Sequence, residues 1–180
     1  MLLQIQLPEH RDGLAYHRQR WAEVVADPQF ADVAETIETN VFGQIIMSPP
    51  PGGEHCRKQY VIARELEKRL GDVAFAECPV LTADGTKVMD AAWFSPSRYA
   101  NVKGQQAFEI GPEICVEVLS PRNTDTEMRI KRELYFDAGA IECWTCDLDG
   151  KMTFCHRDSP DVPIASSQLC PDFPHTIPNP

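Results

Sequence analysis

The stretch from residue 113 to residue 148 constrains the fold more than any other part of the sequence. It begins with "EICVEVL" and ends with "AIECWTCDL", and both runs are typical of β-strands. Between them, Thr124 and Glu127 have capping-box spacing, which predicts a helix over residues 125–138, closed by Gly139. A strand, a helix and a second strand in this order favour two parallel neighbours in one sheet. The stretch therefore predicts a partly parallel, mixed sheet.

Other segments add helices and hairpins around this unit, so the expected fold class is α/β or α+β with a central sheet flanked by helices. Apolar periodicity predicts helices over residues 14–26 and 54–70. Turn signals predict one hairpin of residues 75–81 with 86–94, and another around Asp149-Gly150. The remaining expectations are a short strand within residues 41–48, a loop over residues 95–112, and a surface extension after Ser159.

The composition limits where the chain is expected to work and what it binds. No window approaches the roughly 20 apolar residues of a membrane span, and the first residues lack the pattern of a signal peptide. A cytoplasmic protein without membrane contact is therefore expected. The net charge of −10 argues against broad electrostatic attraction to nucleic acid, because such binding depends on neutralising phosphates.

The seven cysteines are expected to be buried thiols rather than a disulfide framework. Cys143 and Cys146, followed by Cys155 and His156, could also be taken as a zinc site. Residues three apart on a strand point to opposite faces, however, whereas zinc-binding pairs usually sit in tight turns. The strand geometry therefore favours buried thiols.

A carboxylate stands inside the strand-like run "EICVEVL". Alternation places Ile114, Val116 and Val118 on one face, and Glu117 on the other between Cys115 and Leu119. A carboxylate in apolar surroundings is costly unless it is hydrogen-bonded, paired with a cation or bound to a metal. The alternative is an edge strand on which Glu117 faces water.

Asp90 raises the same question in "VMDAAWF", where it shares its expected face with Val88, Ala92 and Phe94. Two acids on neighbouring strands suit a hard cation such as Mg²⁺, which prefers one or two carboxylates and keeps several waters. Lys131, on the helix after the second strand, could reach back toward Glu117. The alternative is a solvated lysine on a helix that also carries other basic residues.

Three segments carry a family resemblance: "IETNVFGQIIMSPPPGGEH", "VMDAAWF" and "ICVEVLSPRNTDTEMRIKRELYFDAGAIECW". They resemble the Uma family of restriction endonuclease-like proteins, within the PD-(D/E)XK nuclease superfamily. The resemblance implies a restriction endonuclease-like domain over residues 37–158, an N-terminal helical extension over residues 1–36, and a Pro-rich C-terminal extension over residues 159–180.

Carried onto this sequence, the resemblance implies that Asp90 and Glu117 ligate Mg²⁺ or Mn²⁺, with the Val118 carbonyl as a further ligand. Glu38 would be an accessory acid. Nucleases of the superfamily usually carry a lysine two residues after the glutamate, where this chain has Leu119. The family's alternative is a lysine on the next helix, which points to Lys131.

Two more positions match the family: His55 and Tyr135, for which we expect supporting roles. His55 could equally be a packing or surface histidine, and Tyr135 a core ring. The implied activity is Mg²⁺-dependent endonuclease cleavage of nucleic acid, with DNA as the expected partner and a homodimer as the expected assembly. The alternative from another class is a catalytically inactive nuclease-fold module for binding or assembly.

Overall fold

The structure, a computed structural model, describes residues 13–71 and 73–178. Its helices are α1 (Leu14–Ala26), the short 3₁₀ helix η1 (Pro28–Phe30), α2 (Gly53–Leu70), α3 (Pro96–Val102) and α4 (Asp125–Asp137). Its strands are β1 (Thr36–Thr39), β2 (Ile45–Ser48), β3 (Ala74–Thr82), β4 (Gly85–Trp93), β5 (Ile114–Val118), β6 (Glu142–Cys146), β7 (Met152–His156) and β8 (Ser159–Ile164).

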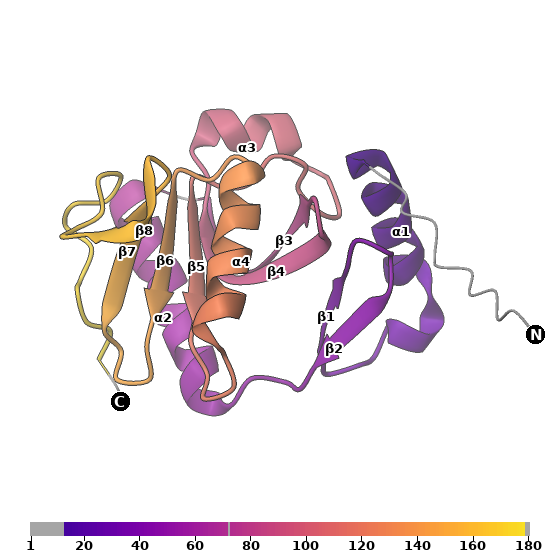
Figure 1. The fold of residues 1–180 in the computed structure, drawn as a ribbon, viewed down its shortest axis with the longest axis horizontal. Helices are drawn as coiled ribbons and strands as arrows, with labels where there is room; N and C mark the ends of the chain where they lie inside the picture. The colour runs from indigo at the N-terminus through magenta and orange to yellow at the C-terminus, as the bar shows by residue number, and fades with distance from the viewer. Residues whose placement is uncertain (1–12, 72, 179–180) are drawn as a thin grey trace, which may run out of the picture.

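The main sheet has six strands in the order β3-β4-β5-β6-β7-β8 (Figure 1). Only β5 and β6 are parallel, and α4 connects them; the other neighbours are antiparallel. The helix α4 begins with the predicted capping box, in which Thr124 and Glu127 bond to each other's backbone N–H. The mixed sheet and the strand–helix–strand unit predicted from the sequence are thus confirmed.

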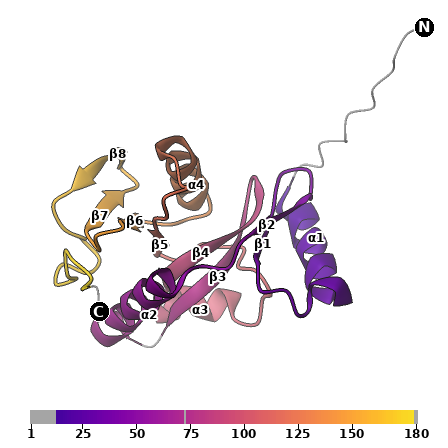
Figure 2. The ribbon, with the colours of Figure 1, turned by 90° about the horizontal axis from the view of Figure 1, so that it is seen from below.

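Helices cover the two faces of this sheet, as the view along the strands shows (Figure 2). On one face, α2 and the C-terminal segment bury an apolar cluster that includes Ile62, Leu66, Trp144 and Phe173. On the other face, α4 and the segment around α3 pack on a second apolar cluster. Burial of both faces accounts for the continuous apolar character of β5 and β6.

A smaller unit sits against the long β3–β4 hairpin. The antiparallel strands β1 and β2 form a two-stranded sheet, and α1 packs beside them through Trp21 and Val24 against Leu81 of the hairpin. The contact is close at Gly85, where φ is +83° and an added Cβ would lie 2.5 Å from the carbonyl oxygen of Thr39. This docking brings β1 beside the part of β4 that β5 does not pair.

Three local expectations differ from the structure. Residues 41–48 form a strand only from Ile45, and its partner β1 was not anticipated. The expected loop over residues 95–112 contains α3, which starts with the Ser95 side chain as cap and a proline in its first turn. The segment Ser159–Ile164 is the edge strand β8 of the main sheet rather than a surface extension. Within the described part of the chain, no helix is long and apolar enough to cross a membrane.

Candidate active site

The burial of Glu117 follows from the central position of β5. The strand lies between β4 and β6, and its residues Ile114, Val116 and Val118 face the cluster under α2, while Cys115 faces the cluster under α4. The predicted alternation is therefore confirmed. The Glu117 side chain is only 13% exposed, so the alternative of a water-facing carboxylate on an edge strand is wrong.

Asp90 lies where the pairing between β4 and β5 ends. The last paired position is Ala91 with Val116, and the next step in this register places Asp90 opposite Glu117. In place of a ladder bond, the Val118 N–H donates to Asp90 Oδ2 at 2.6 Å. The two acids of the sequence prediction thus meet at one point, the carboxyl end of the parallel strand β5.

The residues of β4 do not alternate regularly between the two faces of the sheet on either side of Asp90. Met89 belongs to the same apolar cluster as Ala92, whereas Ala91 belongs to the other, so the alternation is interrupted at Asp90. The residue in register across β3 is Glu77, which has a left-handed backbone with φ of 53°. Such irregularities re-aim a side chain, and here the side chain is turned toward the end of β5.

The helix α2 fixes the Asp90 carboxylate. His55 Nε2 lies 2.9 Å from Asp90 Oδ1, and Gln59, one turn further along the helix, donates its Nε2–H to the same oxygen at 2.7 Å. The pKa of His55 is raised from 6.5, chiefly because of the hydrogen bond to Asp90, against the opposing effect of burial. His55 therefore belongs to this cluster and not to the exposed surface.

Glu38 reaches the cluster from β1. Its Oε1 accepts the Val88 N–H at 3.0 Å and lies 3.2 Å from Lys131 Nζ. The neighbouring Thr39 hydroxyl accepts the Thr86 N–H at 2.9 Å. Side chains of β1 thus bind backbone donors on the part of β4 that β5 does not pair, and they hold Glu38 beside the lysine.

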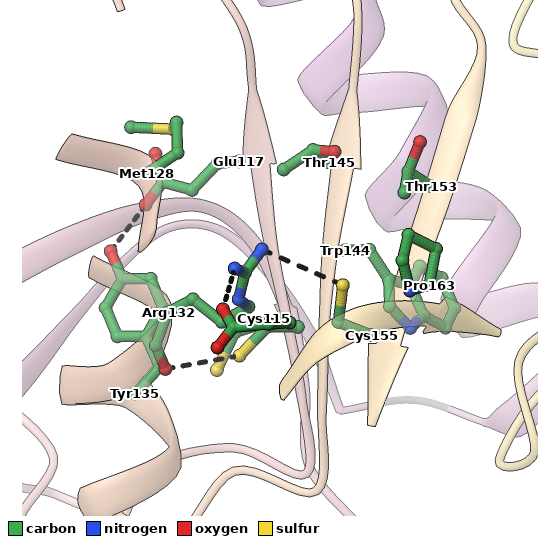
Figure 3. Close-up of a pocket in the computed structure, with 12 residues that line it drawn as sticks. Cys115, Glu117, Met128, Arg132, Tyr135, Trp144, Thr145, Thr153, Cys155 and Pro163 are labelled. Carbon is green, nitrogen blue, oxygen red and sulfur yellow. Dashed lines mark hydrogen bonds and ion pairs between the residues drawn. The ribbon is translucent and has the colours of Figure 1, made fainter. Parts of the chain in front are cut away.

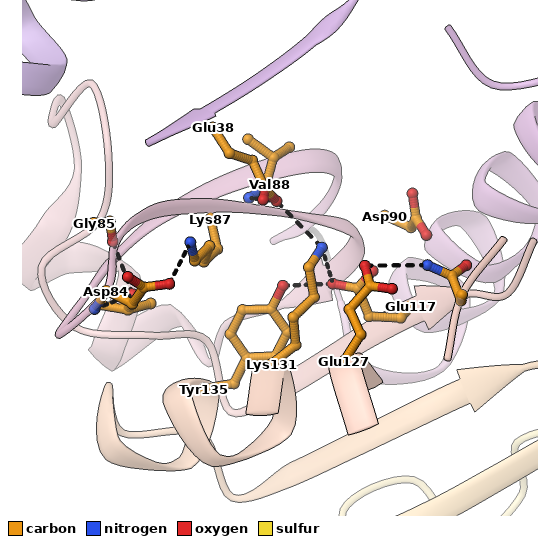
Figure 4. Close-up of polar contacts among 12 residues, drawn as sticks. Glu38, Asp84, Gly85, Lys87, Val88, Asp90, Glu117, Glu127, Lys131 and Tyr135 are labelled. Atoms are coloured by element: carbon orange, nitrogen blue, oxygen red, sulfur yellow. Dashed lines mark hydrogen bonds and ion pairs between the residues drawn. The ribbon is translucent and has the colours of Figure 1, made fainter. Parts of the chain in front are cut away.

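Lys131 lies between two carboxylates on the inner side of α4 (Figure 4). Its Nζ is 3.2 Å from Glu38 Oε1 and 3.5 Å from Glu117 Oε1, and its side chain is 18% exposed. Tyr135, one turn later and 1% exposed, donates its hydroxyl to the same Glu117 oxygen. Lys131 is therefore not the solvated surface lysine of the alternative reading.

Burial and crowding of acids set the charge states. Burial raises the pKa of Glu117 from 4.5 to about 7; Lys131 opposes this rise, and Asp90 and Glu38 add to it. Burial alone lowers the pKa of Lys131, but the charges of Glu117 and Glu38 outweigh it and hold that pKa above its usual range. Burial likewise holds the pKa of Tyr135 well above its ordinary value. The cluster contains more carboxylates than cations to balance them.

The free oxygen positions fit a hard cation. A carboxylate offers about four acceptor sites, and Asp90 uses three, which leaves one on Oδ2. The donors to Glu117 both go to Oε1, so within residues 13–71 and 73–178 its Oε2 has no protein donor. The N–H and C=O of a strand residue project to the same side, so the Val118 carbonyl also faces Asp90. Two carboxylates and a carbonyl suit the open coordination that Mg²⁺ prefers.

The site differs from a closed metal site, in which protein side chains alone complete the coordination. Among the residues that the structure describes, no group of three or more His, Cys, Asp or Glu side chains is arranged to hold a metal ion. Cys143 and Cys146 belong to apolar clusters on opposite faces of the sheet. The described cysteines are all free. The prediction of buried thiols holds, except for the exposed Cys56.

Gln59 is the site residue that sequence reasoning missed. It is 5% exposed and its amide is committed to Asp90. The available signal was its position four residues after His55, which places both side chains on one face of α2. An uncharged amide on a helix gives no other indication of its role, because glutamine is common on helix surfaces.

Comparisons with known proteins agree with this fold. A solved structure from Anabaena variabilis ATCC 29413, described as that of "a putative nuclease belonging to DUF820", is similar with a TM-score of 0.60 and 21% identity, covering 82% of this chain and 92% of that one. The model of the Uma2 family, described as "Putative restriction endonuclease", matches residues 27–176. The chain belongs to this family. A search of curated proteins finds no match.

Proposed function

We propose that the protein is a nuclease that hydrolyses phosphodiester bonds of nucleic acid, with DNA as the expected substrate and Mg²⁺ or Mn²⁺ as the expected cofactor. Membership of a family described as "Putative restriction endonuclease" supports a nuclease function. The observation that carries the proposal is the meeting of Asp90 and Glu117 where the β4–β5 pairing ends, with Lys131 beside Glu117. This combination supplies cation ligands and a fixed positive charge at one point.

Asp90, Glu117 and the Val118 carbonyl would hold the cation. When bound, it polarises a phosphate oxygen and lowers the pKa of a coordinated water. The protein's own contribution is orientation: His55, Gln59 and the Val118 N–H fix Asp90 in place. A ligand held by its neighbours binds with less loss of freedom, so these contacts favour cation binding.

Lys131 acts as a permanent charge in this proposal. Its raised pKa keeps the ammonium protonated, so it does not accept a proton from water. It stabilises negative charge that develops on the phosphate, as preorganised cationic donors do. Glu38 supports this role as an accessory acid, because it holds the ammonium from the side opposite Glu117. Tyr135 supports Glu117 by binding Oε1 and leaving Oε2 free.

A homodimer forms part of the proposal. Each chain carries one such site, so two copies would let two sites face the two strands of a duplex. Light scattering of the purified protein at several concentrations tests this, and a monomer at all of them would contradict the homodimer.

The test measures cation binding and cutting on the same preparations. Mg²⁺ and Mn²⁺ binding is followed by calorimetry, and end-labelled single- and double-stranded DNA by gel, for wild type, Asp90→Ala, Glu117→Ala and Lys131→Met. Asp158→Ala, an exposed acid in the β7–β8 turn, is the control. We expect both acid variants to lose binding and cutting. Lys131→Met should still bind the cation while cutting falls by about 10²–10³-fold.

Two outcomes would change the conclusion. Cation binding without cutting of any nucleic acid would favour an inactive nuclease-fold module for binding or assembly. A wild-type protein that binds no divalent cation at millimolar concentration would overturn the metal-dependent nuclease.

A further inference from the structure

A small cavity continues the candidate site across the sheet on the side away from Lys131. Its volume is about 80 Å³, and it lies between α4 and β8, over β5, β6 and β7 (Figure 3). Glu117, Thr145 and Thr153 line one side of it. The register makes these three a row, because Glu117 pairs with Thr145 and Thr145 pairs with Thr153. Adjacent strands lie about 4.8 Å apart, so the row extends about 10 Å from Glu117.

The two threonine hydroxyls are available to a ligand. Both side chains are half-buried, and within the described residues neither hydroxyl has a hydrogen-bond partner. Each can donate one hydrogen bond and accept others. Thr145 and Thr153 thus extend the unpartnered Oε2 of Glu117 into a polar track.

The rest of the cavity wall is largely apolar, so the polar track forms one side of it. The next row across the same strands consists of Cys115, Cys143 and Cys155, which pair in register and pack under α4. Arg132 closes this end, and its guanidinium is held by Asp161 at 2.9 Å. A polar ligand that enters from Glu117 therefore meets the hydroxyls first.

We propose that Thr145 and Thr153 contact the sugar–phosphate backbone of the nucleic-acid substrate on one side of the bond that is cut. The proposal rests on the nuclease function proposed above and adds the path of the substrate strand, from Glu117 over β6 to β7. Threonine hydroxyls are regular donors to phosphate and sugar oxygens. They position a strand without reading its sequence.

Uncharged hydrogen-bond donors are a suitable means for this acidic chain to bind the nucleic-acid backbone. Its net charge is −10, and two of the basic residues on α4, Arg129 and Arg132, are engaged in ion pairs with Glu133 and Asp161. Few cations are therefore free near the site to attract phosphates. Hydroxyl contacts add affinity without releasing counterions, so their loss weakens binding by the same factor at every salt concentration. Loss of a lysine or arginine that contacts a phosphate would instead make binding less dependent on salt concentration.

The experiment uses the full-length protein with end-labelled DNA of mixed sequence, single- and double-stranded, and RNA of the same sequence. KM and kcat for cutting are measured over a range of NaCl concentrations for wild type, Thr145→Val, Thr153→Val and the double variant. Thr176→Val, on the C-terminal segment that packs on the other face of the sheet, is the matched control. Thr145→Ser and Thr153→Ser restore the hydroxyl and test for its chemistry.

We expect each valine variant to raise KM by about threefold to tenfold, in keeping with one lost hydrogen bond. The salt dependence, kcat, thermal unfolding and Mg²⁺ binding should be unchanged, and the serine variants should behave as wild type. An unchanged KM in the double variant, with the wild type still cutting, would overturn the substrate path and leave the nuclease function standing. A wild type that cuts none of these substrates would remove both.

Discussion

At the amino ends of β5 and β6, Glu113 and Glu142 are buried carboxylates with a donor to each oxygen, whereas Glu117, at the carboxyl end of β5, has donors among the described residues to only one of its oxygens. Glu142 is completely buried and accepts the Trp144 Nε1–H at 2.7 Å and the N–H groups of Gln168 and Leu169 at 2.7 and 3.1 Å. Glu117, on the next strand, leaves Oε2 without a donor among the described residues.

The difference separates a structural acid from a candidate functional one. Where donors match the carboxylate oxygens, the charge is balanced locally and the acid holds segments together, as Glu142 holds the C-terminal segment. Where acids outnumber cations, the balance requires something from outside the chain. In sheets with parallel strands, ligands bind at the carboxyl ends, which is where Glu117 and the neighbouring acid Asp90 lie.

The largest expected effect comes from replacing a glutamate by glutamine at each end of the strands, at Glu142 and at Glu117. Glu142→Gln places an amide N–H₂ against donors, so it should lower the free energy of unfolding by on the order of 2 to 3 kcal/mol. Glu117→Gln removes a charge from an acid-rich site, so at pH 8 it should raise that free energy by a similar amount. Urea denaturation of the metal-free proteins measures both. If both substitutions changed the free energy of unfolding in the same direction, the distinction between a structural acid and a candidate functional one would be wrong.

An effect of comparable size is the pH dependence of stability in the metal-free protein. The pKa of Glu117 is about 7 in the folded protein and 4.5 ordinarily, so the folded state binds the proton more tightly. Stability should therefore fall as pH rises from about 4.5 to 7 and then level off. The raised pKa of His55 acts in the same direction, because its stabilisation is lost as pH rises through the folded value.

The variant Glu117→Gln sharpens this test. It should retain only the fall due to His55, which begins near pH 6.5, and lose the part between pH 4.5 and 6. Unfolding midpoints in urea at half-unit pH steps give the comparison. Identical pH profiles for the variant and the wild type would show that Glu117 is not the group responsible.

The smallest expected effect concerns the support of Asp90. Gln59→Leu keeps the volume and removes the donor to Asp90 Oδ1, so Mg²⁺ affinity should fall by about tenfold, as is usual when a ligand loses its hydrogen-bonded neighbour. Calorimetry measures it, with Gln29→Leu on the exposed 3₁₀ helix as control. An affinity within twofold of wild type would mean that His55 and the Val118 N–H suffice to orient Asp90.

Sequence reasoning reached the parts of this site that follow a regular pattern. The alternation in β5 predicted the face of Glu117, the apolar run around Asp90 marked a second acid, and the capping box at Thr124 predicted the start of α4. The family resemblance then added Lys131 and Glu38 to the two acids. All four lie together in the structure.

The parts that were missed depend on contacts between distant segments. The interruption at Asp90 faces the left-handed backbone of Glu77, a residue that nothing in the local sequence marks. β1 is short and half polar, and it exists as part of a unit docked on the β3–β4 hairpin. β8 carries two prolines, which suit an edge strand and resemble a loop in the sequence.

The 93 positions that separate Glu38 from Lys131 have a consequence for a chain during synthesis. The three acids leave the ribosome before the lysine does, because residues 38, 90 and 117 all precede residue 131. Until α4 has been made and docked, these carboxylates repel one another without a cation between them. A partly synthesised chain therefore cannot form the complete site, and its nuclease chemistry becomes possible only once the chain has been translated through α4.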